Sequence, residues 1–247
     1  MTKPHMPLTL TNLTCGYTNT PLLENITLNI ESHLSILGAN GSGKSTFAKA
    51  LCGLIPFSGK VELFGQNVQD IALKERAKLI SYIPAKLDIY DPYMTLEEFV
   101  LLGRFAHKES FKSYSAEDSK IALACIELLQ ISHLKEHTVA SLSSGEQQLA
   151  QIASALAAQS RIIIFDEPTA NLDPHNAKII AEHIKGLKEY HQIILITHDL
   201  HLACYVDSPI AFLKNKSLLL YGREFFDDAN LEALYGVAFN ALAVRYA

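Results

Sequence analysis

Features typical of secreted, membrane-spanning and disulfide-rich proteins are missing from this 247-residue sequence. Its four cysteines, Cys15, Cys52, Cys125 and Cys204, are far apart and form no C-x-x-C pair, so we expect reduced thiols in a cytosolic protein. Residues 1–10 lack an apolar core of signal-peptide length, and no apolar run approaches the roughly 18 residues that span a bilayer. We therefore expect a chain that is soluble by itself.

An excess of positive charge is also absent. The formal net charge is −5 and no basic tail is present, so the chain has no general attraction to phosphate backbones and nucleic acid is not expected as a partner. No internal repeat or low-complexity segment is evident. With 49% hydrophobic residues, the chain can bury the core of one large domain or of two small ones.

Short apolar runs alternate with helical stretches along the chain. Runs of this kind are typical of strands covered on both faces of a mostly parallel sheet, and they occupy residues 34–38, 79–83, 162–166 and 193–197. The segments "LTLTNLTCGY" and "PIAFLKNKSLLLYG" alternate more like antiparallel strands, with a turn at 214–216 in the second. The pattern predicts an α/β fold, a mostly parallel sheet flanked by helices, with an N-terminal antiparallel β subdomain.

A helical segment interrupts this alternation from Thr95 to about Leu134. Two capping-box patterns, Thr95 with Glu98 and Ser115 with Asp118, each open an amphipathic stretch. We interpret the segment as an inserted α-helical subdomain. The predicted organisation is one domain with its core at about 1–84 and 161–225, the helical subdomain at about 85–160 and a C-terminal tail at 226–247.

The segment "GANGSGKST" fits G-x-x-x-x-G-K-[ST] and lies between a predicted strand and a predicted helix. The glycines let successive backbone amides point inward, and the helix start adds its positive end, so together they cradle polyphosphate. We expect Lys44 to reach the β- and γ-phosphates and the Ser45 hydroxyl to bind Mg²⁺. The predicted ATP-binding residues of this P-loop are Gly38, Asn40, Gly41, Ser42, Gly43, Lys44, Ser45 and Thr46.

Two further apolar strands end in side chains that suit phosphate chemistry. In "IIIFDEP", Asp166 ends the strand at the carboxyl edge of the sheet, where it is predicted to hold Mg²⁺. Glu167 follows it and is suited to orient, or to take a proton from, the water that attacks the γ-phosphate. In "LITHD", His198 is predicted to donate a hydrogen bond to the γ-phosphate. The predicted catalytic residues are therefore Lys44, Glu167 and His198.

The stretch "SLSSGEQQLA" has the pattern of a helix start, because Glu146 follows Ser143 by three residues as in a capping box. Two serines and a glycine nevertheless weaken a first helical turn, since serine competes for backbone partners and glycine carries an entropic cost. Helix stability alone therefore does not explain the residues at this helix start.

A family resemblance supplies an explanation. The order P-loop, "LSSGE", "IIIFDEP", "NLD" and "THD" resembles the nucleotide-binding subunits of ABC transporters over nearly the whole chain. The resemblance implies that "LSSGE" is the signature segment, whose small residues let a partner's ATP approach bare amides. Ser143 and Gly145 would thus contact the γ-phosphate held by another copy, in a head-to-tail dimer with two ATP molecules at its interface, and Ser144 is also assigned to ATP binding.

The same resemblance assigns further residues. Tyr17 occupies the position at which the family stacks an aromatic ring on adenine, and Asp173 that of the D-loop aspartate. Ala85 stands where the family has a glutamine, and Glu146 where it has the signature glutamine. Because alanine offers no amide oxygen to Mg²⁺ or to water, we expect thin metal coordination and slow hydrolysis without the membrane partner.

Segments outside these motifs resemble importer ATPases that serve iron–siderophore, haem or cobalamin permeases: residues 100–107, 114–131 and 230–239. The resemblance implies transmembrane permease subunits and, indirectly, a substrate-binding protein as partners, and a peripheral position on the cytoplasmic face of the cell membrane. Residues around Asp88 to Glu98 are predicted to receive a helix of the permease, with Tyr90, Tyr93 and Met94 as contacts.

Alternatives remain open at this point. A zinc or manganese importer shares the same catalytic residues, and the ATPase of an iron–sulfur cluster assembly scaffold resembles the chain in length and in "SGE". A P-loop kinase acting on a small acceptor is disfavoured by "LSSGE" and by the helical insertion. The histidine pairs 133/137 and 198/201 have helix-like spacing but no obvious third metal ligand.

Overall fold

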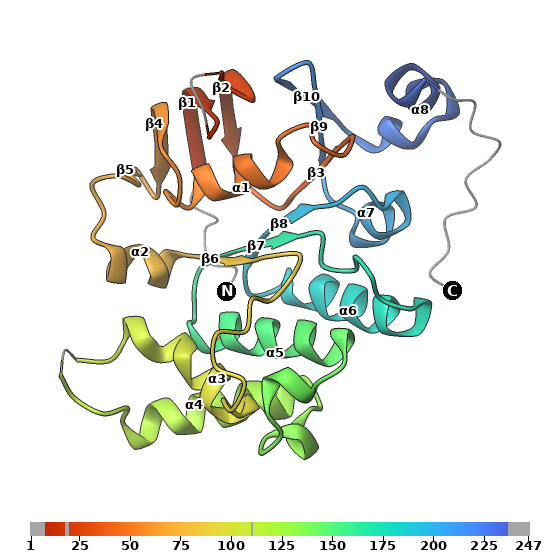
Figure 1. Ribbon diagram of the computed structural model, residues 1–247. Coiled ribbons are helices and arrows are strands. Elements are labelled where there is room, and N and C mark those ends of the chain that lie inside the picture. Colours follow the sequence, from red (N-terminus) through yellow and green to blue (C-terminus); the bar gives the residue numbers. More distant parts are fainter. Residues whose placement is uncertain (1–7, 18–19, 110, 237–247) are drawn as a thin grey trace. The chain divides into compact units, whose positions relative to one another are not determined.

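The computed structural model describes residues 8–17, 20–109 and 111–236 (Figure 1). Its contacts divide the chain into two compact units, the first formed by residues 1–71 and 192–247 and the second by residues 72–191. The helical subdomain predicted for 85–160 falls inside the second unit. This unit also contains residues that follow position 160. The predicted boundaries of the helical subdomain stay a prediction.

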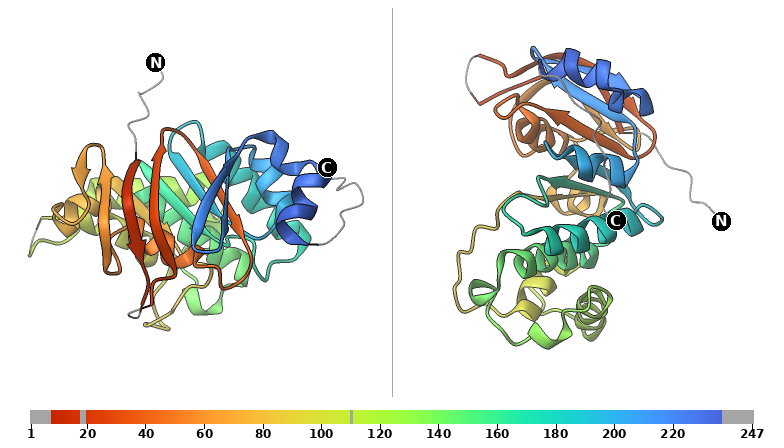
Figure 2. Two further views of the ribbon diagram at one scale, coloured as in Figure 1. Left: turned by 90° about the horizontal axis from the view of Figure 1, so that it is seen from above. Right: turned by 90° about the vertical axis from the view of Figure 1, so that its right-hand side faces the viewer.

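An antiparallel sheet forms one part of the first unit. Its strand order is β2 (Leu23–Ile30), β1 (Leu8–Cys15), β4 (Phe57–Leu63) and β5 (Gln66–Asn67), and β1, β2 and β4 lie side by side in both views of Figure 2. Buried and more exposed residues alternate along β1 except at an irregularity between Leu10 and Leu13. The predicted N-terminal antiparallel subdomain is confirmed.

Buried parallel strands form the other part of the first unit. β3 (Leu34–Gly38) pairs in parallel with β8 (Gln192–Ile196) and with β9 (Ile210–Lys214), and β9 pairs antiparallel with β10 (Ser217–Tyr221). The predicted turn is confirmed, because Asn215 and Lys216 both have positive φ as a two-residue hairpin turn requires. β8 lies one residue earlier than predicted, since Thr197 already belongs to the turn in which its hydroxyl accepts the Asp199 amide.

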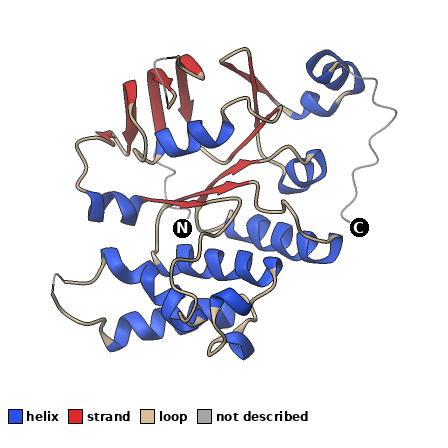
Figure 3. Cartoon of the chain, viewed as in Figure 1, coloured by secondary structure: helices blue, strands red, loops and turns tan. Residues whose placement is uncertain are grey.

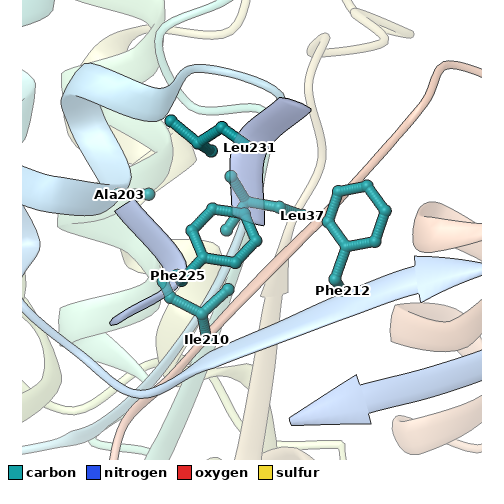
Figure 4. Close-up of a cluster of buried hydrophobic side chains, with 6 residues drawn as sticks. All are labelled: Leu37, Ala203, Ile210, Phe212, Phe225 and Leu231. Atoms are coloured by element: carbon teal, nitrogen blue, oxygen red, sulfur yellow. The ribbon is translucent and has the colours of Figure 1, made fainter. Parts of the chain in front are cut away.

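Helices α1 (Lys44–Leu51), α7 (Leu200–Val206) and α8 (Asp228–Tyr235) and the 3-10 turn η4 (Arg223–Phe226) complete the first unit. η4 and α8 are held by a hydrophobic cluster made of Leu37, Ala203, Ile210, Phe212, Phe225 and Leu231 (Figure 4). Leu37 lies on β3 directly before Gly38, so this cluster also fixes the strand end from which the P-loop starts. Residues 237–239 of the predicted tail motif lie outside the described residues.

The second unit is mostly helical (Figure 3). Its strands β6 (Ile80–Ile83) and β7 (Ile162–Asp166) pair in parallel. The strand predicted from residue 79 starts at Ile80, because Leu79 is the last residue of α2. The remaining elements are α2 (Leu73–Leu79), α3 (Leu96–Leu102), η1 (Gly103–Ala106), α4 (Ala116–Leu128), η2 (Ser132–Leu134), η3 (Val139–Ser141), α5 (Ser144–Ala157) and α6 (Pro174–Leu187).

The helix starts predicted in this unit are confirmed. Thr95 and Ser115 each accept a hydrogen bond from the backbone amide three residues on, and the acid there bonds back to the cap. Each box satisfies amide groups that a helix start otherwise leaves without partners. Together with the buried parallel strands, these helices confirm the predicted α/β class.

A buried ion pair joins the helices of the second unit. Arg104 of η1 donates to Asp118 of α4 at 2.9 Å, to the Ala157 carbonyl of α5 at 2.8 Å and to the Gln159 side chain at 2.9 Å. The Arg104 and Asp118 side chains are only 7% and 11% exposed. One guanidinium thus connects η1, α4 and the C-terminal end of α5.

Candidate functional site

The P-loop is built by the end of β3 and the start of α1 in the first unit. Gly38 and Gly43 both have positive φ, a conformation that strains residues with a β-carbon. At Gly38, an added β-carbon would lie 2.7 Å from the Leu213 carbonyl oxygen. Gly43 precedes α1 without a side-chain cap, so the loop offers backbone amides at the start of a helix. Such an arrangement binds anions.

Lys44 lies inside this loop. It is 6% exposed, and its ammonium donates to the carbonyl oxygens of Gly38 at 2.9 Å and Ala39 at 3.1 Å. The Ser42 hydroxyl is buried and, within the part of the chain that the structure describes, has no hydrogen-bond partner. Asn40, Gly41 and Ser45 are exposed, whereas Thr46 is buried. The loop therefore combines exposed backbone with an ammonium group and a hydroxyl group that can donate hydrogen bonds to phosphate oxygens.

Tyr17 lies in the same unit, after β1. Its side chain is 60% exposed, and the ammonium of Lys49 from α1 lies 5.8 Å from the centre of its ring. An exposed ring of this kind is available for stacking on a base. Sequence reasoning did not identify Lys49, whose contact with the ring depends on how α1 and β1 are placed.

His198 lies at the same edge of the sheet as the P-loop. β3 and β8 are parallel neighbours in which Ile36 pairs with Ile196, so two further residues bring Gly38 and His198 to the same level. His198 is exposed in the turn before α7, whose first turn is capped by Asp199. Parallel strand register therefore places a histidine beside the loop, and its predicted hydrogen bond to the γ-phosphate stays a prediction.

The carboxylates lie in the second unit, at the end of β7. Asp166 is 2% exposed, its Oδ2 accepts a hydrogen bond from the Tyr82 hydroxyl at 2.7 Å, and its Oδ1 is buried without a partner among the described residues. Glu167 follows with φ of 51°, which is uncommon for a residue other than glycine. This conformation turns the chain sharply after the strand, and strained residues of this kind cluster at functional sites.

The signature segment, residues 142–146, opens α5 in the second unit. The predicted capping box is confirmed, since the Glu146 carboxylate accepts from the Ser143 amide at 2.8 Å and from its hydroxyl at 2.7 Å. These hydrogen bonds, that from the hydroxyl first, lower the pKa of Glu146, so a negative charge stands at this helix start. Ser143 and Ser144 are exposed residues, although the amide and hydroxyl of Ser143 are engaged by the Glu146 carboxylate.

Gly145 is buried, and a contact within its own unit requires its small size. A β-carbon there would lie 2.8 Å from Cγ of Asn176 on α6. The Asn176 amide donates to Asp173 at 2.6 Å, and Asp173 accepts the His175 and Asn176 backbone amides to cap α6. Asn176, which sequence reasoning missed, therefore connects the signature segment to the predicted D-loop aspartate.

This contact makes a stability prediction. Gly145→Ala is expected to destabilise the fold by about 1–3 kcal/mol through overpacking, although alanine normally favours a helix. In an Asn176→Ala background the same change should become neutral or stabilising, because the amide that it strikes is gone. Urea unfolding of the four proteins of this double-mutant cycle measures the coupling. Equal effects of Gly145→Ala in both backgrounds would contradict the close contact.

No group of three or more histidine, cysteine or acidic side chains suited to a metal ion occurs in residues 8–17, 20–109 and 111–236. The described chain also contains no helix that is both long and apolar enough to cross a bilayer. The predicted site residues thus divide between the units, with Tyr17, the P-loop and His198 in the first and the signature segment, Asp166, Glu167 and Asp173 in the second.

Known proteins similar to this chain identify its family. The ABC transporter family model matches residues 23–170. An uncharacterized ABC transporter ATP-binding protein of Haemophilus influenzae is 34% identical over 84% of this chain and 80% of its own length. The ferric enterobactin transport ATP-binding protein FepC of Escherichia coli is 32% identical over 91% of this chain and 85% of its own.

A solved structure extends the likeness to the fold. The dimeric ATP-binding cassette MJ0796, in a post-hydrolysis state bound to ADP and phosphate, has a TM-score of 0.74 and 28% identity, and the match covers 87% of this chain and 98% of that one. A kinase acting on a small acceptor is therefore no longer a candidate. The chain belongs to the ABC transporter family and is one of its ATP-binding, ATP-hydrolysing subunits.

Proposed function

We propose that this chain drives the import of an iron chelate, of siderophore, haem or cobalamin type, through a separate membrane permease. The P-loop, with its left-handed glycines and Lys44 folded inside, is the observation that carries the ATPase part. The cargo class rests on likeness to relatives such as FepC, whose name specifies ferric enterobactin transport. The chain would lie on the cytoplasmic face of the cell membrane, attached through its permease.

Within this proposal, Tyr17 stacks on adenine, and the P-loop amides with Lys44 hold the phosphates. Ser45 and Asp166 would hold Mg²⁺. The buried Asp166 Oδ1, which has no hydrogen-bond partner in the described part of the chain, is the kind of atom that fits a hard cation. When bound, the metal ion neutralises charge that develops on the phosphate oxygens. Glu167 accepts a proton from the attacking water, and His198 donates to the γ-phosphate.

The second copy completes the site. In a head-to-tail dimer, Ser143, Ser144 and Gly145 of one chain cap the ATP held by the P-loop of the other, and Asp173 lies near the shared interface. The exposure of Ser143 and Ser144 at the start of α5 supports this role. MJ0796 is a dimeric cassette of the same family.

A hollow of about 430 Å³ in the second unit is the proposed seat of the permease helix. It is lined largely by apolar side chains of α2, β6, α3, η1 and α5, including Leu73, Phe99 and Phe105. Tyr90 and Tyr93, predicted as contacts, are 93% and 84% exposed but do not line this hollow. Both tyrosines lie in the segment between Leu87 and Phe99, two residues that do line the hollow. They would therefore contact the permease outside the hollow.

Subunit mixing tests the composite site. Ser143→Arg should lower ATPase activity by about 10²- to 10³-fold, the usual effect of losing a positioned phosphate contact, and Lys44→Ala should do at least as much. A mixture of the two variants forms some dimers with one intact site, so it should regain up to about a quarter of the wild-type rate. An active Ser143→Arg protein, or a mixture as inactive as its parts, would contradict the shared site.

Cargo and direction need the membrane partner. The chain should be reconstituted with the permease encoded beside it, and ATP hydrolysis measured with candidate loaded binding proteins. Stimulation by a binding protein carrying an iron chelate, with uptake into the vesicle, is expected. Stimulation by zinc or manganese carriers would replace the proposed cargo, and co-purification with a soluble scaffold would indicate iron–sulfur assembly instead.

A further inference from the structure

Tyr82 and Asp166 lie on the same face of the pair of strands β6 and β7. Tyr82 is paired with Ile164 in the parallel register, and Asp166 follows Ile164 by two residues. Because side chains two residues apart point to the same face of a strand, the tyrosine can reach along the sheet to the carboxylate. The Tyr82 hydroxyl donates to Asp166 Oδ2 at 2.7 Å, a distance typical of a hydrogen bond between oxygen atoms.

The two oxygens of Asp166 therefore differ. Oδ2 accepts the Tyr82 hydroxyl, whereas Oδ1 is buried and has no partner among the residues that the structure describes. A hydrogen bond to one carboxylate oxygen restricts rotation of the whole group and directs the other oxygen. Hydrogen bonds of this kind to metal-binding carboxylates commonly orient them and tune metal affinity.

The tyrosine ring is only partly exposed. Tyr82 is half-buried and lines the 430 Å³ hollow, together with Phe99 and Gln151. The hydroxyl is carried by a rigid aromatic ring rather than by a long flexible chain, which suits a residue that must hold another in place. Three residues later, Ala85 has no polar side chain with which to contribute.

We propose that Tyr82 is a positioning residue for the metal-binding carboxylate: its hydroxyl holds Asp166 Oδ2 so that Oδ1 faces the Mg²⁺ that accompanies ATP. This inference rests on the proposed role of Asp166 as a metal ligand. It assigns Tyr82 no direct contact with nucleotide. The hydroxyl acts entirely through the carboxylate, which distinguishes its expected effects from those of the P-loop residues.

The test measures how much a metal ion strengthens ATP binding. All proteins carry Glu167→Gln, so that ATP is not consumed during titration, and ATP affinity is measured by calorimetry with Mn²⁺ and again with a chelator. Tyr82→Phe removes only the hydroxyl. Tyr114→Phe makes the same change elsewhere in the second unit and is the matched control, and Asp166→Asn replaces the charged oxygen of the proposed ligand by a neutral amide oxygen.

With Tyr82→Phe, we expect the gain in affinity from Mn²⁺ to fall by about 10-fold or more, while affinity with chelator stays unchanged. Tyr114→Phe should keep the full gain. Circular dichroism establishes the unfolding midpoint of each variant, and titrations are run well below it so that only folded protein contributes.

Two results would overturn the inference in different ways. If Tyr82→Phe keeps the full metal-dependent gain while Asp166→Asn loses it, Tyr82 does not position the carboxylate although the proposed metal site stands. If Asp166→Asn also keeps the gain, the proposed metal role of Asp166 fails and the inference fails with it.

Discussion

Replacing Glu167 with glutamine is expected to lower kcat for ATP hydrolysis by about 10²- to 10⁴-fold, the usual contribution of a positioned general base. The amide cannot accept the proton of the attacking water, so the chemical step slows. ATP affinity should stay within a few-fold of wild type, because nothing in the P-loop changes. Steady-state kinetics and equilibrium binding of ATP measure the two effects separately.

The position of Glu167 supports an effect on the chemical step rather than on folding. It follows β7 directly, and its left-handed φ of 51° turns it away from the line of the strand. Glutamine tolerates this backbone as glutamate does, so the fold should persist. Glu189→Gln, at an exposed site after α6 in the same unit, is the control and should leave kcat unchanged.

Retained hydrolysis in Glu167→Gln would assign the base to another group. A large loss of ATP affinity with little change in kcat would equally contradict the role given to Glu167. If the proposal holds, ATP should convert the Glu167→Gln protein to a stable dimer in size-exclusion chromatography, since closure by ATP is no longer reversed by hydrolysis.

Arg104→Met is expected to destabilise the protein by about 3–5 kcal/mol, because it leaves Asp118 buried without its cationic partner. For a chain of this size that corresponds to a fall of about 6–20 °C in the unfolding midpoint. The Ala157 carbonyl and the Gln159 side chain would also lose their donor. Methionine preserves most of the apolar stem, so the loss reports mainly on the charge and its hydrogen bonds.

An exposed ion pair in the same unit provides the matched control. Lys112 and Glu109 approach to 2.6 Å, but their side chains are 69% and 72% exposed. Lys112→Met should therefore cost no more than about 1 kcal/mol. Similar shifts for the two methionine variants, measured by thermal unfolding, would contradict the role of the buried pair.

The stability difference between wild type and Arg104→Met should also depend on pH. Hydrogen bonds from the Ser115 hydroxyl and amide, and then Arg104, lower the pKa of Asp118 from 3.8 to about 2. Because the folded value lies below the unfolded one, the carboxylate stabilises the fold above the unfolded value. That stabilisation is lost as pH falls from 3.8 toward 2. The Ser115 hydrogen bonds remain in Arg104→Met, so the difference between the two proteins should shrink over this range only by the smaller contribution of Arg104.

Local sequence was enough for features that depend on neighbouring residues. The three capping boxes, the buried strands and the hairpin turn at Asn215 and Lys216 were all predicted, because each is decided by spacing within a few residues. The predicted strand edges were displaced by one residue at Leu79 and Thr197, where a helix end and a turn compete with the strand.

Functional motifs that depend on residue types within a short segment could also be predicted from the sequence. The P-loop, the acids after β7 and the signature serines were identified because each lies beside its own strand or helix start. Their roles as site residues stay predictions.

Only the tertiary structure revealed the residues that support those motifs. Tyr82 is 84 residues from Asp166 in sequence, and their contact follows from the pairing and register of β6 and β7. From the sequence, Gly145 was predicted to contact phosphate. Its contact with Asn176 is visible only in the packing of α5 against α6. Motif residues obey short-range rules of backbone and charge, whereas the side chains that hold them are chosen by long-range packing, which a single sequence does not display.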